Sequence, residues 1–216
     1  MPERLRREVR LSTPDILIER IRCLRPSDDR RVIIGITGAP GAGKSTLAQD
    51  VVSRLGSTAA LFPMDGFHFS NSVLRALDRE RRKGSPDTFD VGGYLAMLDR
   101  LRDPARPTVF APSFNRELDE PIANDLPIAS EVSVVITEGN YLLTSSYGWG
   151  AARIRLDEVW YVEIPRELRV ERLTARHVAF GKDPSQAASW ALGPDERNAQ
   201  LIAAARALAD VIVTAG

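Results

Sequence analysis

The sequence is poor in cysteine and in long apolar runs, and both absences limit what the chain can be. Its one cysteine, Cys23, has no partner for a disulfide within the chain, which agrees with a reducing interior. No apolar run reaches the length of a membrane span, so we expect no membrane partner. Residues 1–14 carry charges and lack the apolar core of a signal peptide, and we therefore expect a cytoplasmic protein.

An excess of positive charge is also missing. The 216 residues include 29 basic and 29 acidic side chains, which gives a formal net charge of zero. Nucleic-acid-binding proteins usually show a basic excess, so we expect no nucleic-acid partner. Lysine itself is scarce, since Lys44, Lys83 and Lys182 are the only lysines. Positions where lysine was retained are therefore informative.

What the sequence does contain is an alternation of short apolar runs and amphipathic segments. Hydrophobic residues make up 44% of the chain, enough for one large core. Short β-branched runs predict buried strands at 31–37, 58–64, 133–139, 158–164 and 210–215. Helical spacing predicts helices at 14–24, 44–55, 73–83, 91–102, 165–178, 184–192 and 195–209. This order predicts an α/β fold of three layers, in which helices cover both faces of a mostly parallel sheet.

The chain shows neither internal repeats nor a clear linker, so we expect a single domain over residues 1–216. Residues 1–30 are predicted to form an N-terminal helical extension. Residues 103–130 are rich in proline, and we expect an irregular insertion in which 107–112 is a candidate short strand.

Residues 38–45, with the sequence GAPGAGKS, match the phosphate-binding pattern G-x-x-x-x-G-K-[ST]. The motif follows a predicted strand and opens a predicted helix, which is the context that this pattern requires. Glycines let the backbone N–H groups turn inward, and the helix N-terminus adds partial positive charge. Lys44 is expected to reach the β- and γ-phosphates of ATP, and the Ser45 hydroxyl to bind Mg²⁺. The predicted nucleotide-binding residues are Gly38, Ala39, Pro40, Gly41, Ala42, Gly43, Lys44, Ser45 and Thr46.

Two acidic residues follow predicted strands at the same edge of the sheet, where ligands of α/β proteins bind. Glu138 ends an apolar run in the manner of a Walker B acid, which holds Mg²⁺; the alternative is a surface glutamate at a strand end. Asp65 lies in the stretch FPMDGFHFSN, where Asp-Gly is also a hairpin signal. The flanking residues do not alternate, and Pro63 is a poor central-strand residue. We therefore favour Asp65 as the catalytic base that accepts the proton of a substrate hydroxyl.

Six motifs occur in one order: GAPGAGKST, MDGFHFSN, KGSPDTFD, APSFNRELDEPI, TEGNYLL and RHVAFGKDPSQAASW…DERNAQLI. Together they resemble the P-loop kinase group that includes uridine kinase, phosphoribulokinase and bacterial type I pantothenate kinase. The resemblance is strongest to the short bacterial members, often labelled nucleoside/nucleotide kinase-like or fructose transport system kinase. It implies a P-loop NTPase fold with a helical lid at 166–195, a catalytic base at Asp65, a magnesium-binding acid at Glu138 and an acceptor-binding Arg116. Asn115 stands where the group has aspartate, which leaves its effect on acceptor choice open.

Three arginines share one face of the predicted lid helix. Arg169, Arg172 and Arg176 are spaced three and four residues apart, which aligns them on a helix. A solvated helix face is the alternative, but the resemblance implies a lid that brings basic side chains onto the transferred phosphate. We therefore expect Arg172 and Arg176 to be catalytic together with Lys44.

The aromatic residues near the predicted acids are candidates for the acceptor pocket. Phe67, His68 and Tyr141 flank Asp65 or Glu138 in the sequence, and we predict that they bind the acceptor together with Arg116. The alternative for each aromatic ring is a place in the core, where such residues are more often found.

These observations predict an ATP- and Mg²⁺-dependent kinase that phosphorylates a hydroxyl group of a small metabolite. The acceptor can be a sugar such as fructose, a nucleoside such as uridine, or pantothenate, and the residues do not choose among them. The alternative is a nucleotide-dependent switch or ATP-sensing protein without kinase activity, which needs Lys44 and Ser45 but has no use for Asp65. Related kinases are often dimers, so the resemblance leaves a homodimer open.

Overall fold

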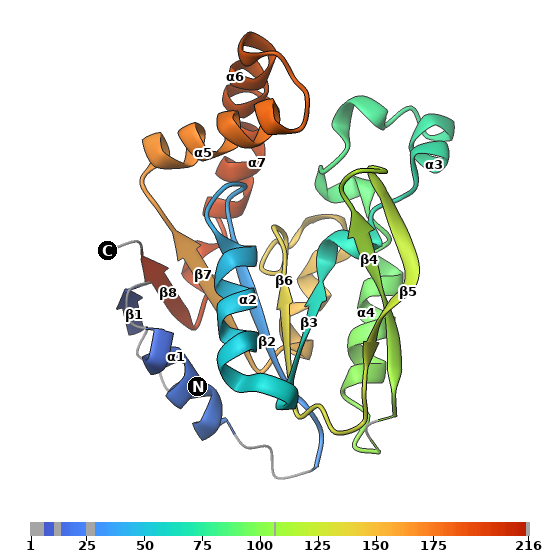
Figure 1. Cartoon of the computed structure of the whole chain (residues 1–216), viewed down its shortest axis with the longest axis vertical. Helices are drawn as coiled ribbons and strands as arrows, with labels where there is room; N and C mark the ends of the chain where they lie inside the picture. Colours follow the sequence, from blue (N-terminus) through green and yellow to red (C-terminus); the bar gives the residue numbers. More distant parts are fainter. Residues whose placement is uncertain (1–6, 11–13, 25–28, 106, 215–216) are drawn as a thin grey trace.

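The computed structural model describes residues 7–10, 14–24, 29–105 and 107–214. Its centre is a six-stranded sheet in the order β1-β8-β7-β2-β6-β3, with every strand pair parallel (Figure 1). The strands are β1 (Arg7–Arg10), β2 (Val32–Gly38), β3 (Ala59–Pro63), β6 (Val134–Glu138), β7 (Glu158–Glu163) and β8 (Val211–Thr214). The predicted α/β fold is confirmed, and β1 is an additional strand within the segment expected to be helical.

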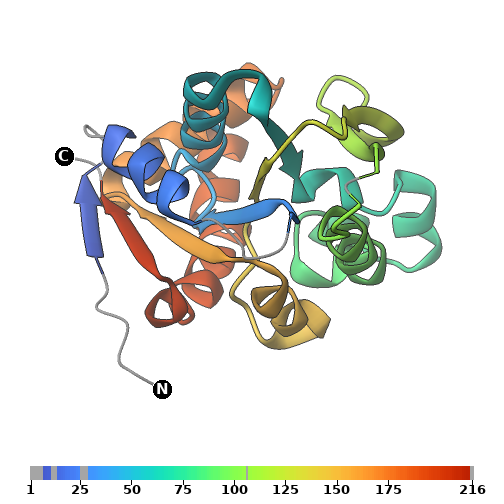
Figure 2. The same cartoon turned by 90° about the horizontal axis from the view of Figure 1, so that it is seen from below.

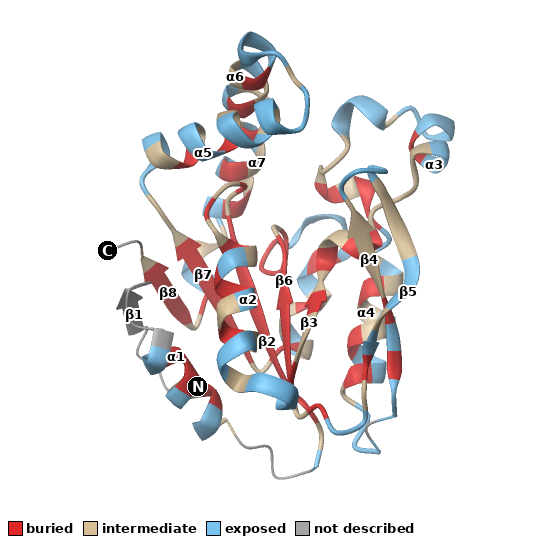
Figure 3. Cartoon of the chain, viewed as in Figure 1, coloured by how far each residue is buried: buried red, intermediate tan, exposed pale blue. Residues whose placement is uncertain are grey.

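Helices cover both faces of this sheet, as the view from below shows (Figure 2). Apolar residues of α1 (Pro14–Cys23) and α2 (Lys44–Leu55) pack with Ile34 and Ile36 on one face. On the other face, α4 (Val91–Leu101), α7 (Pro194–Ala203) and the 3-10 turns at 146–155 pack around Ile33. Strands β2 and β6 are buried along their whole length, as expected for a parallel sheet between two helical layers (Figure 3).

The proline-rich segment forms a hairpin: the candidate strand at 107–112 overlaps the first of its two strands, but the prediction that the segment is otherwise irregular is wrong. Strands β4 (Val109–Asn115) and β5 (Glu120–Ile128) pair antiparallel in a separate two-stranded sheet. Prolines are tolerated here because a two-stranded sheet has only edge strands, and the register shifts between Ala111 and Ser113. The hairpin packs against η2 (Met64–Phe67), the 3-10 turn that follows β3.

Other differences concern the ends of helices. The helix predicted at 73–83 is the short α3 (Asn71–Ala76), which stops before Asp78, whose φ is 54°. The helix predicted at 195–209 ends at Ala203. Helices α5 (Arg166–Ala179) and α6 (Pro184–Leu192) agree with the predictions. Within the described residues, no helix is both long and apolar enough to cross a membrane.

The strand order places the chemically interesting residues together. Strand β6 lies between β2 and β3, and Glu138 at its end is opposite Ile36 on one side and Pro63 on the other. The loop after β2 and the turn after β3 therefore flank Glu138. Helices α5 and α6 stand above this edge on one side, and residues 71–90 with the hairpin tip stand on the other (Figure 1).

Candidate active site

The loop between β2 and α2 is shaped by glycines. Gly38, Gly41 and Gly43 have φ angles of 149°, 80° and 95°, which other residues rarely adopt. A side chain at Gly38 would also come within 2.5 Å of the carbonyl oxygen of Val162. No side chain caps the N-terminus of α2, so its first backbone N–H groups are free to meet an anion. Lys44 begins this helix, and its Nζ donates to two carbonyl oxygens of the loop at 2.9 and 3.0 Å.

A hydroxyl group and a carboxylate lie side by side next to this loop. The Ser45 hydroxyl donates to Oε1 of Glu138 over 3.1 Å. Burial, together with the nearby charge of Asp65, raises the pKa of Glu138 to about 6. Burial lowers the pKa of Lys44 to about 8, although Glu138 and Asp65 favour its charged form. Two oxygen ligands at the phosphate loop fit Mg²⁺, which is usually bound by one or two protein oxygens together with phosphates.

Asp65 is not at the tip of a hairpin. It lies in the 3-10 turn η2, and its neighbour Gly66 allows β4 to approach closely, because a side chain at Gly66 would lie 2.4 Å from the carbonyl oxygen of Pro112. The Asp65 carboxylate faces the cleft with 31% of its side chain exposed. Its Oδ2 is 3.7 Å from Nη2 of Arg116, which projects from the β4–β5 hairpin tip.

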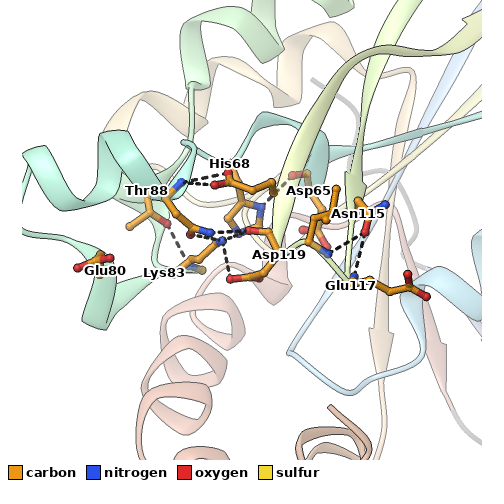
Figure 4. Close-up of polar contacts among 12 residues, drawn as sticks. Asp65, His68, Glu80, Lys83, Thr88, Asn115, Glu117 and Asp119 are labelled. Atoms are coloured by element: carbon orange, nitrogen blue, oxygen red, sulfur yellow. Dashed lines mark hydrogen bonds and ion pairs between the residues drawn. The ribbon is translucent and has the colours of Figure 1, made fainter. Parts of the chain in front are cut away.

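His68 lies beside Asp65 at the same cleft (Figure 4). Its ring packs between Phe89 and Phe114, with centroid distances of 4.0 and 4.8 Å. Its Nδ1 is 2.8 Å from the backbone carbonyl oxygen of Asp65. Burial lowers the pKa of His68, which favours the neutral imidazole and a donating Nδ1–H.

Phe67 and Tyr141 occupy different places from those predicted. Both are buried in the core, where Phe67 packs edge-on against Tyr94 at 5.3 Å. The Tyr141 hydroxyl donates to the carbonyl oxygen of Gly84. Neither residue lines the cleft, so the prediction of direct acceptor contacts is not supported for them. They support the cleft wall from behind.

Two cavities meet at the phosphate loop. A cleft of about 420 Å³ extends from the loop between residues 81–85 on one side and α5–α7 on the other. A groove of about 840 Å³ follows the start of α2, beside Thr46 and Asp50. Five residues line both cavities: Gly41, Lys44, Ser45, Arg116 and Arg176.

The three arginines of α5 have different surroundings. Arg169 is buried and paired with Glu196, and it lines neither of the two cavities. Arg172 lines the groove next to Gly43, and Arg176 lines both cavities. Arg172 and Arg176 are thus the two arginines of this set that line the cavities, and their catalytic role stays a prediction.

The structure adds residues to the cleft that sequence reasoning missed. Nε2 of His177 is 2.7 Å from Oδ2 of the buried Asp195, and both line the cleft. Lys83 donates to Oδ1 of Asn71 at 2.6 Å and pairs with Asp119 at 2.7 Å, joining the α3 segment to the hairpin tip (Figure 4). Lys83 and Asp195 lie in the motifs KGSPDTFD and DERNAQLI, but neither was predicted to line the site.

Asn115 has a local structural role. Its Oδ1 accepts hydrogen bonds from the backbone N–H groups of Glu117 and Leu118, both at 2.9 Å, and so shapes the turn that presents Arg116 (Figure 4). An aspartate oxygen at this position would accept the same bonds.

The glycine loop, the uncapped start of α2 and the acid on the adjacent strand define a P-loop NTPase fold. No protein-family model matches the chain. The "ATP-dependent kinase-like protein notR′" of Aspergillus versicolor is 38% identical over 133 residues, which cover 58% of this chain and 77% of that protein. A Schizosaccharomyces pombe protein provisionally named uridine kinase is 30% identical over 161 residues, covering 70% and 68% of the two chains.

A solved structure of another kinase is similar over nearly the whole chain. It is a provisionally named fructose transport system kinase from Silicibacter sp. TM1040, with a TM-score of 0.85 and 35% identity, covering 93% of this chain and 98% of that one. The chain therefore belongs to the P-loop kinase family of these proteins, and the resemblance seen in its motifs is confirmed.

Proposed function

We propose that the chain is an ATP- and Mg²⁺-dependent kinase that transfers the γ-phosphate to a hydroxyl group of a small metabolite. The observation that carries the proposal is the meeting of the two cavities at Lys44, Ser45, Arg116 and Arg176. A phosphoryl group can pass between two ligands only where their sites touch. Three cations and a hydroxyl at that junction match the charge that such a transfer must stabilise.

In this proposal the groove along α2 takes ATP and the cleft takes the acceptor. Lys44 exchanges its two carbonyl partners for phosphate oxygens, and the backbone N–H groups at the start of α2 bind the same phosphates. Mg²⁺ held by Ser45 and Glu138 would offset negative charge on the phosphates. Arg176 reaches the transferred group from α5, and Arg172 contacts the nucleotide in the groove.

Asp65 is the proposed catalytic base. Its carboxylate is on the acceptor side of the junction and can take the proton of the attacking hydroxyl. Arg116 pairs with this side chain and holds it towards the junction, and the neutral His68 offers the acceptor a further hydrogen-bonding partner. The names of the relatives leave a sugar, a nucleoside and pantothenate as acceptor classes.

Asp65→Asn separates a kinase from a nucleotide-dependent switch. The variant keeps the side-chain shape and loses the base, so we expect ADP release with an acceptor to fall at least 100-fold while ATP binding is retained. Asp99→Asn on α4 removes an exposed carboxylate that pairs with Arg155 far from the cleft, and it serves as the matched control. The measurement is a coupled ADP-release assay over sugars, nucleosides and vitamin precursors, with ATP binding followed by calorimetry. Full turnover in Asp65→Asn would refute the role of this residue.

A further inference from the structure

We infer that the acceptor carries an anionic group, a carboxylate or a phosphate, and that Arg81 and Arg197 bind it. The inference rests on the proposed function, because it takes the cleft to be the acceptor site. It begins from a charge imbalance: seven cationic and three carboxylate side chains line this cleft, although the whole chain has a net charge of zero. The cations are Lys44, Arg81, Arg82, Lys83, Arg116, Arg176 and Arg197, and the carboxylates are Asp65, Glu138 and Asp195.

Each of the three carboxylates already has a partner in the protein. Asp65 faces Arg116 at 3.7 Å, and Glu138 accepts from the Ser45 hydroxyl at 3.1 Å. Asp195 is paired with His177 at 2.7 Å. The remaining cations of the cleft are therefore not needed to satisfy these acids.

The cations themselves fall into three groups. Lys44, Arg116 and Arg176 line both cavities and are placed for the phosphates of ATP. Arg82 and Lys83 are each bound to an aspartate outside the cleft, at 2.6 and 2.7 Å. This leaves the third group, Arg81 and Arg197, on the acceptor side alone.

Arg81 and Arg197 come from opposite walls. Arg81 lies in the 3-10 turn Glu80–Arg82, on the wall formed by residues 81–85, and Arg197 lies on α7. Among the residues that the structure describes, neither guanidinium has a hydrogen-bonded or ion-paired partner. Both side chains are exposed, so their charges are available to a ligand at the cost of little desolvation.

The two ends of the cleft are therefore suited to bind two different chemical groups of one acceptor molecule. The end at the phosphate loop, with Asp65 and His68, suits a hydroxyl group. The end bordered by Arg81 and Arg197 suits a planar carboxylate or a phosphate, which guanidinium groups bind through charge-assisted hydrogen bonds. A neutral sugar or nucleoside would leave both arginines unused.

The test compares related acceptors with and without an anionic group. Four matched pairs are supplied to the full chain with ATP and Mg²⁺: ribose and ribose 5-phosphate, fructose and fructose 6-phosphate, glucose and gluconate, and pantothenyl alcohol and pantothenate. We expect the anionic member of at least one pair to have a kcat/KM roughly 10- to 100-fold higher, since a charge-assisted hydrogen bond is worth that much. The pair that responds identifies the anionic group as a phosphate or a carboxylate.

Variants of Arg81 and Arg197 test whether these two side chains cause the preference for an anionic acceptor. Arg81→Gln and Arg197→Gln should each raise KM for the anionic acceptor about tenfold, leave kcat nearly unchanged and have little effect on its neutral counterpart. Arg100→Gln, on α4 outside the cleft, is the matched control and should change neither value. A preference for the neutral member, or an anion preference that both variants retain, would overturn the inference while leaving the kinase proposal intact.

Binding of the acceptors can be measured without phosphoryl transfer, which tests the anion site separately from kinase activity. Calorimetric titration with adenylyl imidodiphosphate and Mg²⁺ present reports on the cleft without chemistry. Tighter binding of anionic members that is lost in Arg81→Gln supports the inference even if no acceptor is phosphorylated, a result that would count against the kinase proposal alone. No binding by any anionic member would count against the inference.

Discussion

Replacing Glu138 with glutamine should stabilise the fold and abolish activity. The side chain is only 7% exposed, and burial together with Asp65 raises its pKa from the ordinary value of 4.5 to about 6. Keeping this carboxylate ionised in the folded protein therefore costs on the order of 2 kcal/mol at pH 7.5. Glutamine is neutral, has the same shape and keeps an oxygen for the Ser45 hydroxyl, so the substitution removes the penalty without opening a cavity.

The stability difference between Glu138→Gln and the wild type should depend on pH, and its direction follows from the raised pKa of Glu138. Below pH 4.5 the Glu138 carboxyl is protonated in both the folded and the unfolded chain, so it is neutral like glutamine. As the pH rises through 4.5 to 6, only the unfolded chain ionises freely, and the wild type loses stability relative to the variant. Above pH 6 the difference is constant. The variant should therefore match the wild type at pH 4 and exceed it at pH 7.5.

Thermal and urea unfolding without Mg²⁺ measure this difference. For a chain of this size, about 2 kcal/mol corresponds to a rise in Tm of roughly 4–8 °C. Glu171→Gln, an exposed site on α5, is the control and should stay within about 0.5 kcal/mol of the wild type. Loss of a magnesium ligand should lower turnover at least 100-fold in Glu138→Gln. A variant that is less stable at pH 7.5, or whose stability difference does not change with pH, would refute the reasoning.

Three further predictions follow from other contacts. The buried Arg31 donates to four backbone carbonyl oxygens, so Arg31→Met should destabilise the fold by about 3–5 kcal/mol in urea unfolding; a loss below 1 kcal/mol would contradict this. Lys83→Met removes the contacts that join the α3 segment to the hairpin tip and should raise the acceptor KM about tenfold, with Tm little changed, whereas Lys182→Met should change neither KM nor Tm. The pH profile of kcat/KM should rise through pH 6 as Glu138 ionises and fall above pH 8 as Lys44 loses its proton; a flat profile between pH 5 and 9 would be inconsistent with these two groups.

The phosphate loop and its acidic neighbours could be predicted because they depend on local patterns and on a general rule. Glu138 and Asp65 each follow a strand, and parallel strands end at the same edge of a sheet. The other residues of the site are brought together by contacts between segments that are far apart in the sequence. Lys83 meets Asp119 across 36 residues, and nothing in either local sequence pairs them.

Even for adjacent residues such as Phe67 and His68, the sequence alone did not predict which side chain faces the cleft. Phe67 turns into the core while His68 turns into the cleft, because residues 64–67 form a 3-10 turn. Sequence proximity to the acids predicted both as acceptor contacts. The hairpin was missed for a related reason: proline argues against a central strand, and only the tertiary structure shows that β4 and β5 form a sheet of their own.

The separateness of that small sheet has a consequence for how such a protein can diversify. The β4–β5 hairpin contributes Arg116 to the junction, yet the nucleotide loop, Lys44, Ser45 and Glu138 all belong to the six-stranded sheet and its helix. The hairpin that brings Arg116 to the junction is thus built independently of the sheet that carries the phosphate loop. Grafting residues 109–128 from one relative onto another would then change the surroundings of Arg116 while Lys44, Ser45 and Glu138 stay in place.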